Sequence, residues 1–189
     1  MLLALVGVTG VGKTYFKDKI VEELGFKKVN TIRTRKIRQG EQAGKVGLFM
    51  TPEEVDELEK DDKLAYRFSV FGGEYAYLKD EIFSKDNYVF EMHYTTIYDW
   101  KKIRKDLKTI YILPSDIDLA KEKTKARELS PEKEQERLAE IDEHYNRYMQ
   151  DKDLQKQFDY VIYNNYDKES KEKILDLVKR LLEEETKNV

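Results

Sequence analysis

The 189-residue chain contains no cysteine, only two histidines and only three prolines. Without cysteine it can form neither a disulfide nor a thiolate-ligated zinc site, and nothing in it indicates an oxidising compartment. It also lacks a hydrophobic run of membrane-spanning length. The apolar segment Leu2–Val8 is far too short, and it has no basic flank typical of a signal peptide. We therefore expect a cytoplasmic protein that does not act at a membrane.

An excess of positive charge is also missing. The formal net charge is -3, so no global basic field argues for a nucleic-acid partner, and any anion site must be local. Charged residues make up 39% of the chain and hydrophobic residues 40%, which suits one globular domain with a small subdomain. The sequence does not determine the oligomeric state, and a homodimer is one arrangement that we consider.

Short apolar runs alternate with segments of helical periodicity along the chain. The alternation predicts an α/β fold of three layers, α/β/α, with a mostly parallel sheet covered on both faces. The expected strands are Leu2–Val6, Tyr88–Met92, Thr109–Leu113 and Phe158–Tyr163, with further short strands within Ala65–Tyr77. The expected helices are Thr14–Leu24, Thr51–Glu59, Ile117–Arg127, a charged helix from Ser130 to about Met149, and Lys171–Leu182. Thr51 and Ser130 each precede a proline and resemble capped helix starts.

One motif explains why the hydrophobic strand expected at Leu2–Val6 is followed at once by glycines. The segment Gly7–Thr14, GVTGVGKT, matches G-x-x-x-x-G-K-[ST] in full. Its glycines let several backbone N–H groups point into one concavity, which binds phosphate together with the following helix N-terminus. Lys13 would reach the β- and γ-phosphates of ATP, and the Thr14 hydroxyl would bind Mg²⁺. The predicted nucleotide-binding residues of this loop are Gly7, Thr9, Gly10, Val11, Gly12, Lys13 and Thr14.

Several later segments together resemble the guanylate kinases, the enzymes that phosphorylate GMP with ATP. The segment Thr34–Glu41 is similar to that family's T-R-x-P-R-x-G-E, with Ile37 where proline is usual. The resemblance extends in order over about Leu2 to Leu182 through Phe49–Glu54, Phe71–Tyr75, Ile112–Ser115, Arg137-Leu138 and Val161–Asn165. It implies a phosphate-loop fold, a nucleoside monophosphate subdomain at about 31–80 and a helical lid at about 120–150.

The resemblance also implies an acceptor site opposite the phosphate loop. Arg35 and Arg38 would clamp the acceptor phosphate, because guanidinium groups match phosphate oxygens in fork geometry. Tyr75 matches a family tyrosine, and Thr31 lies where the family has a serine near phosphate or base. The alternative is that Lys27 to Lys45 is only a solvated basic stretch.

The positions that read guanine in the family differ here. Tyr66, Tyr77 and His93 match a carboxylate, a serine or threonine, and an aspartate, and tyrosine cannot accept two guanine N–H groups as a carboxylate does. Either the acceptor base differs or is held loosely by stacking, or the alignment is shifted and Glu74 or Glu91 reads the base. A purely structural His93 is a further alternative.

Further roles follow from the same resemblance. Glu91 matches an aspartate at a strand end and would hold a magnesium-bound water, and Asn164 lies where the family contacts adenine. Arg127, with Lys123, and Arg137 match lid cations at the transferred phosphoryl, and Arg127 is the first choice for the catalytic arginine. Each could instead be an exposed helix charge.

Three functions fit this pattern. The leading one is an ATP- and Mg²⁺-dependent nucleoside monophosphate kinase of guanylate kinase type with uncertain base preference. The second is a catalytically inert protein-binding module, which would not need Lys13 and Thr14. The third is a kinase for another small phosphate acceptor.

Overall fold

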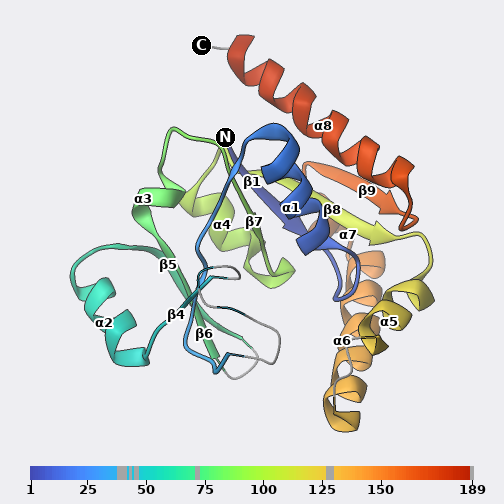
Figure 1. Ribbon diagram of the computed structural model, residues 1–189, viewed down its shortest axis with the longest axis horizontal. Coiled ribbons are helices and arrows are strands. Elements are labelled where there is room, and N and C mark those ends of the chain that lie inside the picture. The colour runs from blue at the N-terminus through green and yellow to red at the C-terminus, as the bar shows by residue number, and fades with distance from the viewer. Residues whose placement is uncertain (38–41, 43, 45–46, 71–72, 127–129, 188–189) are drawn as a thin grey trace.

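The computed structural model describes residues 1–37, 42, 44, 47–70, 73–126 and 130–187. Its main sheet has five strands in the order β2-β7-β1-β8-β9, and all neighbours are parallel (Figure 1). These strands are β1 Leu2–Val6, β2 Lys27–Lys28, β7 Tyr88–Glu91, β8 Lys108–Pro114 and β9 Tyr160–Asn164. Because the strands are parallel, their carboxyl ends gather at one edge, which is where a ligand site is expected in such sheets.

The central strand β1 is buried on both faces, which explains its continuous apolar sequence. Leu3 and Leu5 pack into one core with α1 (Lys13–Leu24) and α8 (Lys168–Lys187). Leu2 and Val6 face a second core with α4 (Ile97–Ile103). Helices thus cover both faces of the sheet, and the predicted three-layer α/β/α fold is confirmed.

A second sheet of four strands lies beside the first, in the order β4-β3-β6-β5. Its strands are β3 Ile32–Arg33, β4 Leu48–Phe49, β5 Leu64–Val70 and β6 Gly73–Leu78. The helix α2 (Pro52–Lys60) closes a small core of Ile32, Val55 and Ala76. Thr51 and Glu54 form the expected reciprocal cap at the start of α2. The sheet falls within residues 31–80, whose role as the monophosphate subdomain stays a prediction.

Two helices, α5 (Ile117–Lys125) and α6 (Pro131–Gln150), form a hairpin at the carboxyl edge of the main sheet. The predicted side-chain cap at Ser130 is wrong, because that side chain makes no capping hydrogen bond although Pro131 begins the helix. Ile141, His144 and Tyr148 are the buried residues of α6 and lie at helical spacing on one face. This hairpin covers most of the range predicted as the lid.

The remaining elements are short. They are α3 (Lys79–Ile82), the 3₁₀ turn η1 (Tyr94–Thr96) and α7 (Lys152–Gln155). Within the part of the chain that the structure describes, no helix combines the length and apolar character needed to cross a bilayer.

Candidate active site

The loop between β1 and α1 adopts a conformation that requires glycine. Gly7 has φ +148°, and a Cβ there would lie 2.4 Å from the Ile112 carbonyl oxygen. Gly10 has φ +82°, and a Cβ there would lie 2.3 Å from the Ala120 carbonyl oxygen. The close packing of the loop against β8 and α5 thus leaves no room for a side chain at Gly7 or Gly10. The sequence motif and this backbone together fit a cradle for phosphate.

Lys13 and Thr14 begin α1 at the end of this loop. The Lys13 Nζ donates to the carbonyl oxygens of Gly7 and Val8, each at 2.8 Å. The Thr14 hydroxyl donates to Glu91 Oε1 at 2.9 Å, and Lys17 Nζ donates to the same oxygen at 2.5 Å. The two residues predicted to hold the metal, Thr14 and Glu91, therefore lie in direct contact.

Glu91 ends β7, the neighbour of β1, and keeps its charge despite burial. Burial alone would raise its pKa, but the ammonium groups of Lys17 and Lys13 and the hydrogen bonds from Lys17 and Thr14 outweigh burial, so the pKa lies below its usual range. An ionised carboxylate and a hydroxyl are oxygen ligands that Mg²⁺ prefers. The residues present therefore fit the predicted magnesium.

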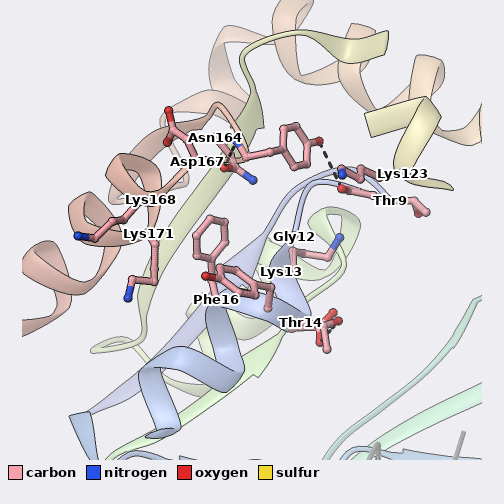
Figure 2. A pocket seen from close by; sticks show the side chains of 14 residues that line it. Thr9, Gly12, Lys13, Thr14, Phe16, Lys123, Asn164, Asp167, Lys168 and Lys171 are labelled. Atoms are coloured by element: carbon pink, nitrogen blue, oxygen red, sulfur yellow. Dashed lines mark hydrogen bonds between the residues drawn. The ribbon is translucent and has the colours of Figure 1, made fainter. Parts of the chain in front are cut away.

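A cavity of about 840 Å³ opens on one side of the loop. Its volume lies in the range of sites for small ligands. Figure 2 shows Asn164 beside the loop, with Lys168 and Lys171 from α8 on one side of the cavity and Lys123 from α5 on the other. The lining residues are Thr9, Gly10, Gly12, Lys13, Thr14, Tyr15, Phe16, Glu91, Lys123, Asn164, Tyr166, Asp167, Lys168 and Lys171.

Asn164 holds the loop as well as lining this cavity. Its Nδ2 donates to the Val11 carbonyl oxygen at 3.0 Å, and the side chain is buried. Tyr166 is a site residue that the sequence analysis missed. Its hydroxyl donates to the Gly10 carbonyl oxygen at 3.3 Å, and burial, with the charge of Asp116, raises its pKa to about 12. Its left-handed backbone, φ 59°, has no simple sequence signal.

A second cavity of about 300 Å³ lies between the loop, the four-stranded sheet and α6. It is lined by Gly7, Thr9, Lys13, Thr14, Lys17, Thr31, Arg33, Arg35, Phe68, Val70, Tyr75, Tyr77, Glu91, Met92, His93, Arg137, Glu140 and His144. Among these residues, five carry a positive charge (Lys13, Lys17, Arg33, Arg35, Arg137) and two carry a negative charge (Glu91, Glu140). The excess of cations in this lining would attract an anion, although the chain as a whole has a net negative charge.

Arg35, which the sequence analysis assigns to the acceptor phosphate, lines this second cavity. Its guanidinium lies over the Phe49 ring, 5.5 Å from the centroid, and Nη1 donates to the Lys36 carbonyl oxygen at 3.0 Å. Arg33, which the sequence analysis missed, lies on the same wall with its guanidinium 5.9 Å from the Tyr75 ring centroid. Its position two residues before Arg35, at the end of β3, is the sequence signal that could have indicated it.

The tyrosines at the base-reading positions differ in placement. Tyr77 lines the second cavity but is 2% exposed and packs edge-on against Trp100 and Phe90. Tyr66 donates its hydroxyl to Asp99 Oδ2 at 2.9 Å and packs on Trp100. Within the described part of the chain, Tyr66 lines neither of these two cavities. Burial raises the pKa of both phenols, so both stay protonated at neutral pH.

The two carboxylates considered as alternative base readers are both engaged by cations. Glu74 accepts from Arg67 Nη2 at 2.8 Å through each of its oxygens. Glu91 accepts from Thr14 and Lys17, as described above. Both carboxylates thus already accept hydrogen bonds from other side chains, and neither is reserved for the N–H groups of a base.

His93 follows β7 and reaches the second cavity beside His144 and Glu140 of α6. Burial, the other histidine and Lys13 lower the pKa of His93 to about 4. Burial also lowers the pKa of His144 to about 4, although the negative charge of Glu143 acts in the opposite direction and raises this pKa. The sequence analysis missed His144 and Glu140, because only the fold brings α6 to the end of β7.

Arg137 projects from α6 into the second cavity and forms an ion pair with Glu140, one turn further along the helix. Thr31, also predicted, lies buried in the lining of this cavity. The predicted Arg38 and Arg127 fall outside the described residues.

Comparison with known proteins identifies the family. A family profile described as Guanylate kinase matches residues 1–185, nearly the whole chain. The chain belongs to the guanylate kinase family. A protein named Guanylate kinase from Wolbachia pipientis wMel is 29% identical to this guanylate kinase family member over 189 residues, which is 95% of this chain and 90% of that protein.

Solved structures agree with this assignment at the level of the fold. The crystal structure of guanylate kinase from Anaplasma phagocytophilum matches with a TM-score of 0.70 and 19% identity, over 95% of this chain and 85% of that one. Shikimate kinase from Bacteroides thetaiotaomicron matches with a TM-score of 0.52 and 14% identity, over 97% and 98% of the two chains. This guanylate kinase family member therefore shares its fold with kinases of differing names.

Proposed function

We propose that this protein transfers the γ-phosphoryl group of ATP to a nucleoside monophosphate. The observation that carries the proposal is the meeting of the two cavities at the end of the phosphate loop. Both cavities are lined by Thr9, Lys13, Thr14 and Glu91. A donor in the larger cavity and an acceptor in the smaller one would thus meet beside Lys13, as in-line transfer requires.

The residues at this junction suit the charge that must be stabilised. The Lys13 ammonium would pair with the donor phosphates, and Thr14 with Glu91 would hold Mg²⁺ by oxygen ligands. When bound, the metal neutralises phosphate charge at the reacting centre. Arg137 from α6 would add a guanidinium on the lid side of the same junction.

The acceptor side supplies guanidinium groups to a dianionic phosphate. Arg35 and Arg33 line the wall formed by the four-stranded sheet, and Tyr75 lies next to them. Guanidinium forks match phosphate oxygens better than ammonium groups do. This arrangement favours a phosphorylated acceptor over a neutral alcohol.

We also propose that base selection is weak and that guanine is not strongly preferred. The cavity wall is aromatic, with Phe68 stacked on Tyr75 at a centroid distance of 5.5 Å. Glu74 accepts hydrogen bonds from Arg67, and Glu91 accepts one from Lys17. Neither carboxylate is therefore reserved for the N–H groups of guanine. A base held by stacking is discriminated less than one read by a buried hydrogen-bond pattern.

An ADP-release assay with ATP·Mg²⁺ and each common nucleoside monophosphate tests both parts. We expect turnover with several acceptors, GMP among them but without a large advantage in kcat/KM. A preference for GMP of about 10⁴ or more, the range of a dedicated hydrogen-bonding site, would contradict weak selection. No turnover with any monophosphate would favour the binding-module alternative.

A further inference from the structure

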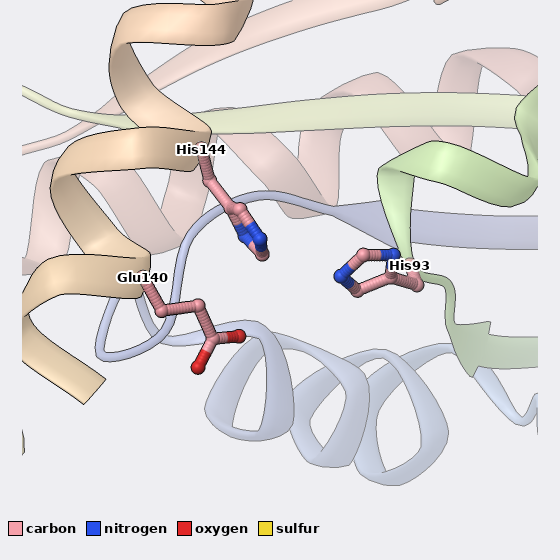
Figure 3. A group of neighbouring side chains, drawn as sticks. All are labelled: His93, Glu140 and His144. Carbon is pink, nitrogen blue, oxygen red and sulfur yellow. The ribbon is translucent and has the colours of Figure 1, made fainter. Parts of the chain in front are cut away.

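We propose that His93, Glu140 and His144 form a binding site for a transition-metal dication of the Zn²⁺ class, separate from the predicted magnesium. One ligand atom from each side chain lies within 4.8 Å of those of the other two. The two imidazoles meet edge to face with ring centroids 5.0 Å apart. Figure 3 shows all three side chains converging between α6 and the segment after β7.

The backbone explains how three ligands reach one point. Glu140 and His144 lie four residues apart on α6, so their side chains leave the same face on successive turns. His93 comes from the carboxyl end of β7, the opposite wall. Ligands on a tetrahedral Zn²⁺ are about 3.4 Å apart when each bond is about 2.1 Å, so an approach of at most about 1.4 Å between ligand atoms, from the limit of 4.8 Å, completes the site.

The hydrogen bonds around the site orient its ligands. His93 Nδ1 lies 2.6 Å from the Thr95 hydroxyl, and an Nδ1–H donated there leaves the Nε2 lone pair for the ion. Glu140 Oε2 accepts from Arg137, which fixes the carboxylate on the cavity side of α6. The proposed site has three protein ligands and leaves the fourth coordination position toward the cavity. Zinc sites that keep one exchangeable ligand have this pattern.

The ligand set selects which ion binds. Two imidazoles and one carboxylate suit Zn²⁺ or Co²⁺, whereas Mg²⁺ and Ca²⁺ prefer oxygen ligands alone. The neighbouring cations Lys13 and Arg137 oppose any dication, so only an ion that bonds strongly to imidazole is expected to bind. A bound ion would tie α6 to the end of β7.

The chain makes this site simple to test, because these are its only two histidines and it has no cysteine. Wild-type protein is titrated with Co²⁺ and with Zn²⁺ without nucleotide, in a large excess of Mg²⁺. We expect one Co²⁺ per chain with the visible absorption of a four- or five-coordinate ion, displaced by Zn²⁺. Both imidazole signals should shift in NMR spectra of the Zn²⁺ form. Absence of binding, or an unmoved imidazole signal, would overturn the proposal.

Variants separate ligation from simple attraction of charge. Glu140→Gln and His144→Ala should each weaken Zn²⁺ binding by about 100-fold or more, since even an outer partner of a zinc ligand contributes 10- to 100-fold. The matched control is Glu143→Gln, which removes the same charge from an exposed position next to His144. Equal losses for Glu140→Gln and Glu143→Gln would contradict ligation. If His144→Ala does not fold, the wild-type NMR titration still decides.

Discussion

At the residue scale, a substitution of Arg35 tests most directly how the acceptor phosphate is bound. Arg35→Lys keeps the charge but removes the planar fork, so kcat/KM for the nucleoside monophosphate should fall by about 10²–10⁴. Part of the loss should appear in KM and part in kcat, because the contact exists in both ground and transition states. Steady-state rates with ATP and acceptor varied separately provide the measurement.

The control for Arg35→Lys is the exposed neighbour Lys36, whose side chain does not line either cavity among the described residues. Lys36→Gln should leave kcat/KM nearly unchanged. A loss at Arg35 that is confined to the KM of ATP would place this arginine on the donor side instead.

Glu74 gives a second test at this scale. Arg67 binds both of its oxygens at 2.8 Å, so we assign Glu74 to holding β5 against β6 and not to the base. Glu74→Gln should lower the free energy of unfolding by about 1–2 kcal/mol and leave the ranking of nucleoside monophosphates unchanged. Chemical denaturation and the ADP-release assay measure the two effects. A changed ranking would return base reading to Glu74.

Single residues differ in how well the sequence alone predicts them. Lys13 and Thr14 are predictable because their motif is contiguous and each position has its own chemical reason. Tyr166, His144 and Glu140 are not, because their contacts depend on the packing of distant elements. For Tyr66 the sequence suggests a role that its contacts do not support. It aligns with a base-reading position of the family, but its hydroxyl donates to Asp99.

At the scale of elements, the turn from β1 to α1 can be tested with two glycines of similar backbone. Gly10 and Gly25 have φ of +82° and +72°, but a Cβ at Gly10 would meet the Ala120 carbonyl oxygen at 2.3 Å, whereas a Cβ at Gly25 meets nothing within 4 Å. Gly25→Ala should cost about 1–2 kcal/mol of stability and spare ATP binding.

Gly10→Ala should cost more stability than Gly25→Ala and weaken ATP binding by about tenfold or more, which is about 1.4 kcal/mol or more. Calorimetric titration with ATP·Mg²⁺ and thermal unfolding of both variants provide the comparison. Equal effects of the two substitutions would show that backbone strain, and not the shape of the loop, governs binding.

The predictability of the elements follows from their length and from what buries them. The strand Leu2–Val6 and the helix that follows were predictable because each has a full apolar pattern. The pairs Lys27–Lys28 and Ile32–Arg33 were not, because a two-residue strand is defined by its neighbour and leaves no periodicity. The C-terminal helix runs beyond the predicted Lys171–Leu182 to Lys168–Lys187, where exposed charged residues continue it.

At the scale of the whole molecule, three parts of the fold meet at one place. The main sheet with the adjoining helix α1 supplies Glu91 and Lys13, the segment that follows β3 of the four-stranded sheet supplies Arg35, and α6 supplies Arg137. From the sequence, the convergence of these three parts is predicted only by the family resemblance, because the order of segments does not show which of them meet. In the structure, the convergence follows from the two cavities, which share the end of the phosphate loop.

The most direct test of the account compares wild-type protein with Lys13→Ala for ADP formation from ATP·Mg²⁺ and a nucleoside monophosphate. Circular dichroism and thermal unfolding must first show that both proteins are folded. The account predicts turnover by the wild type and a loss of at least about 10³-fold in kcat for Lys13→Ala, as for other groups that stabilise the transferred phosphoryl. Equal rates for the two folded proteins would contradict it.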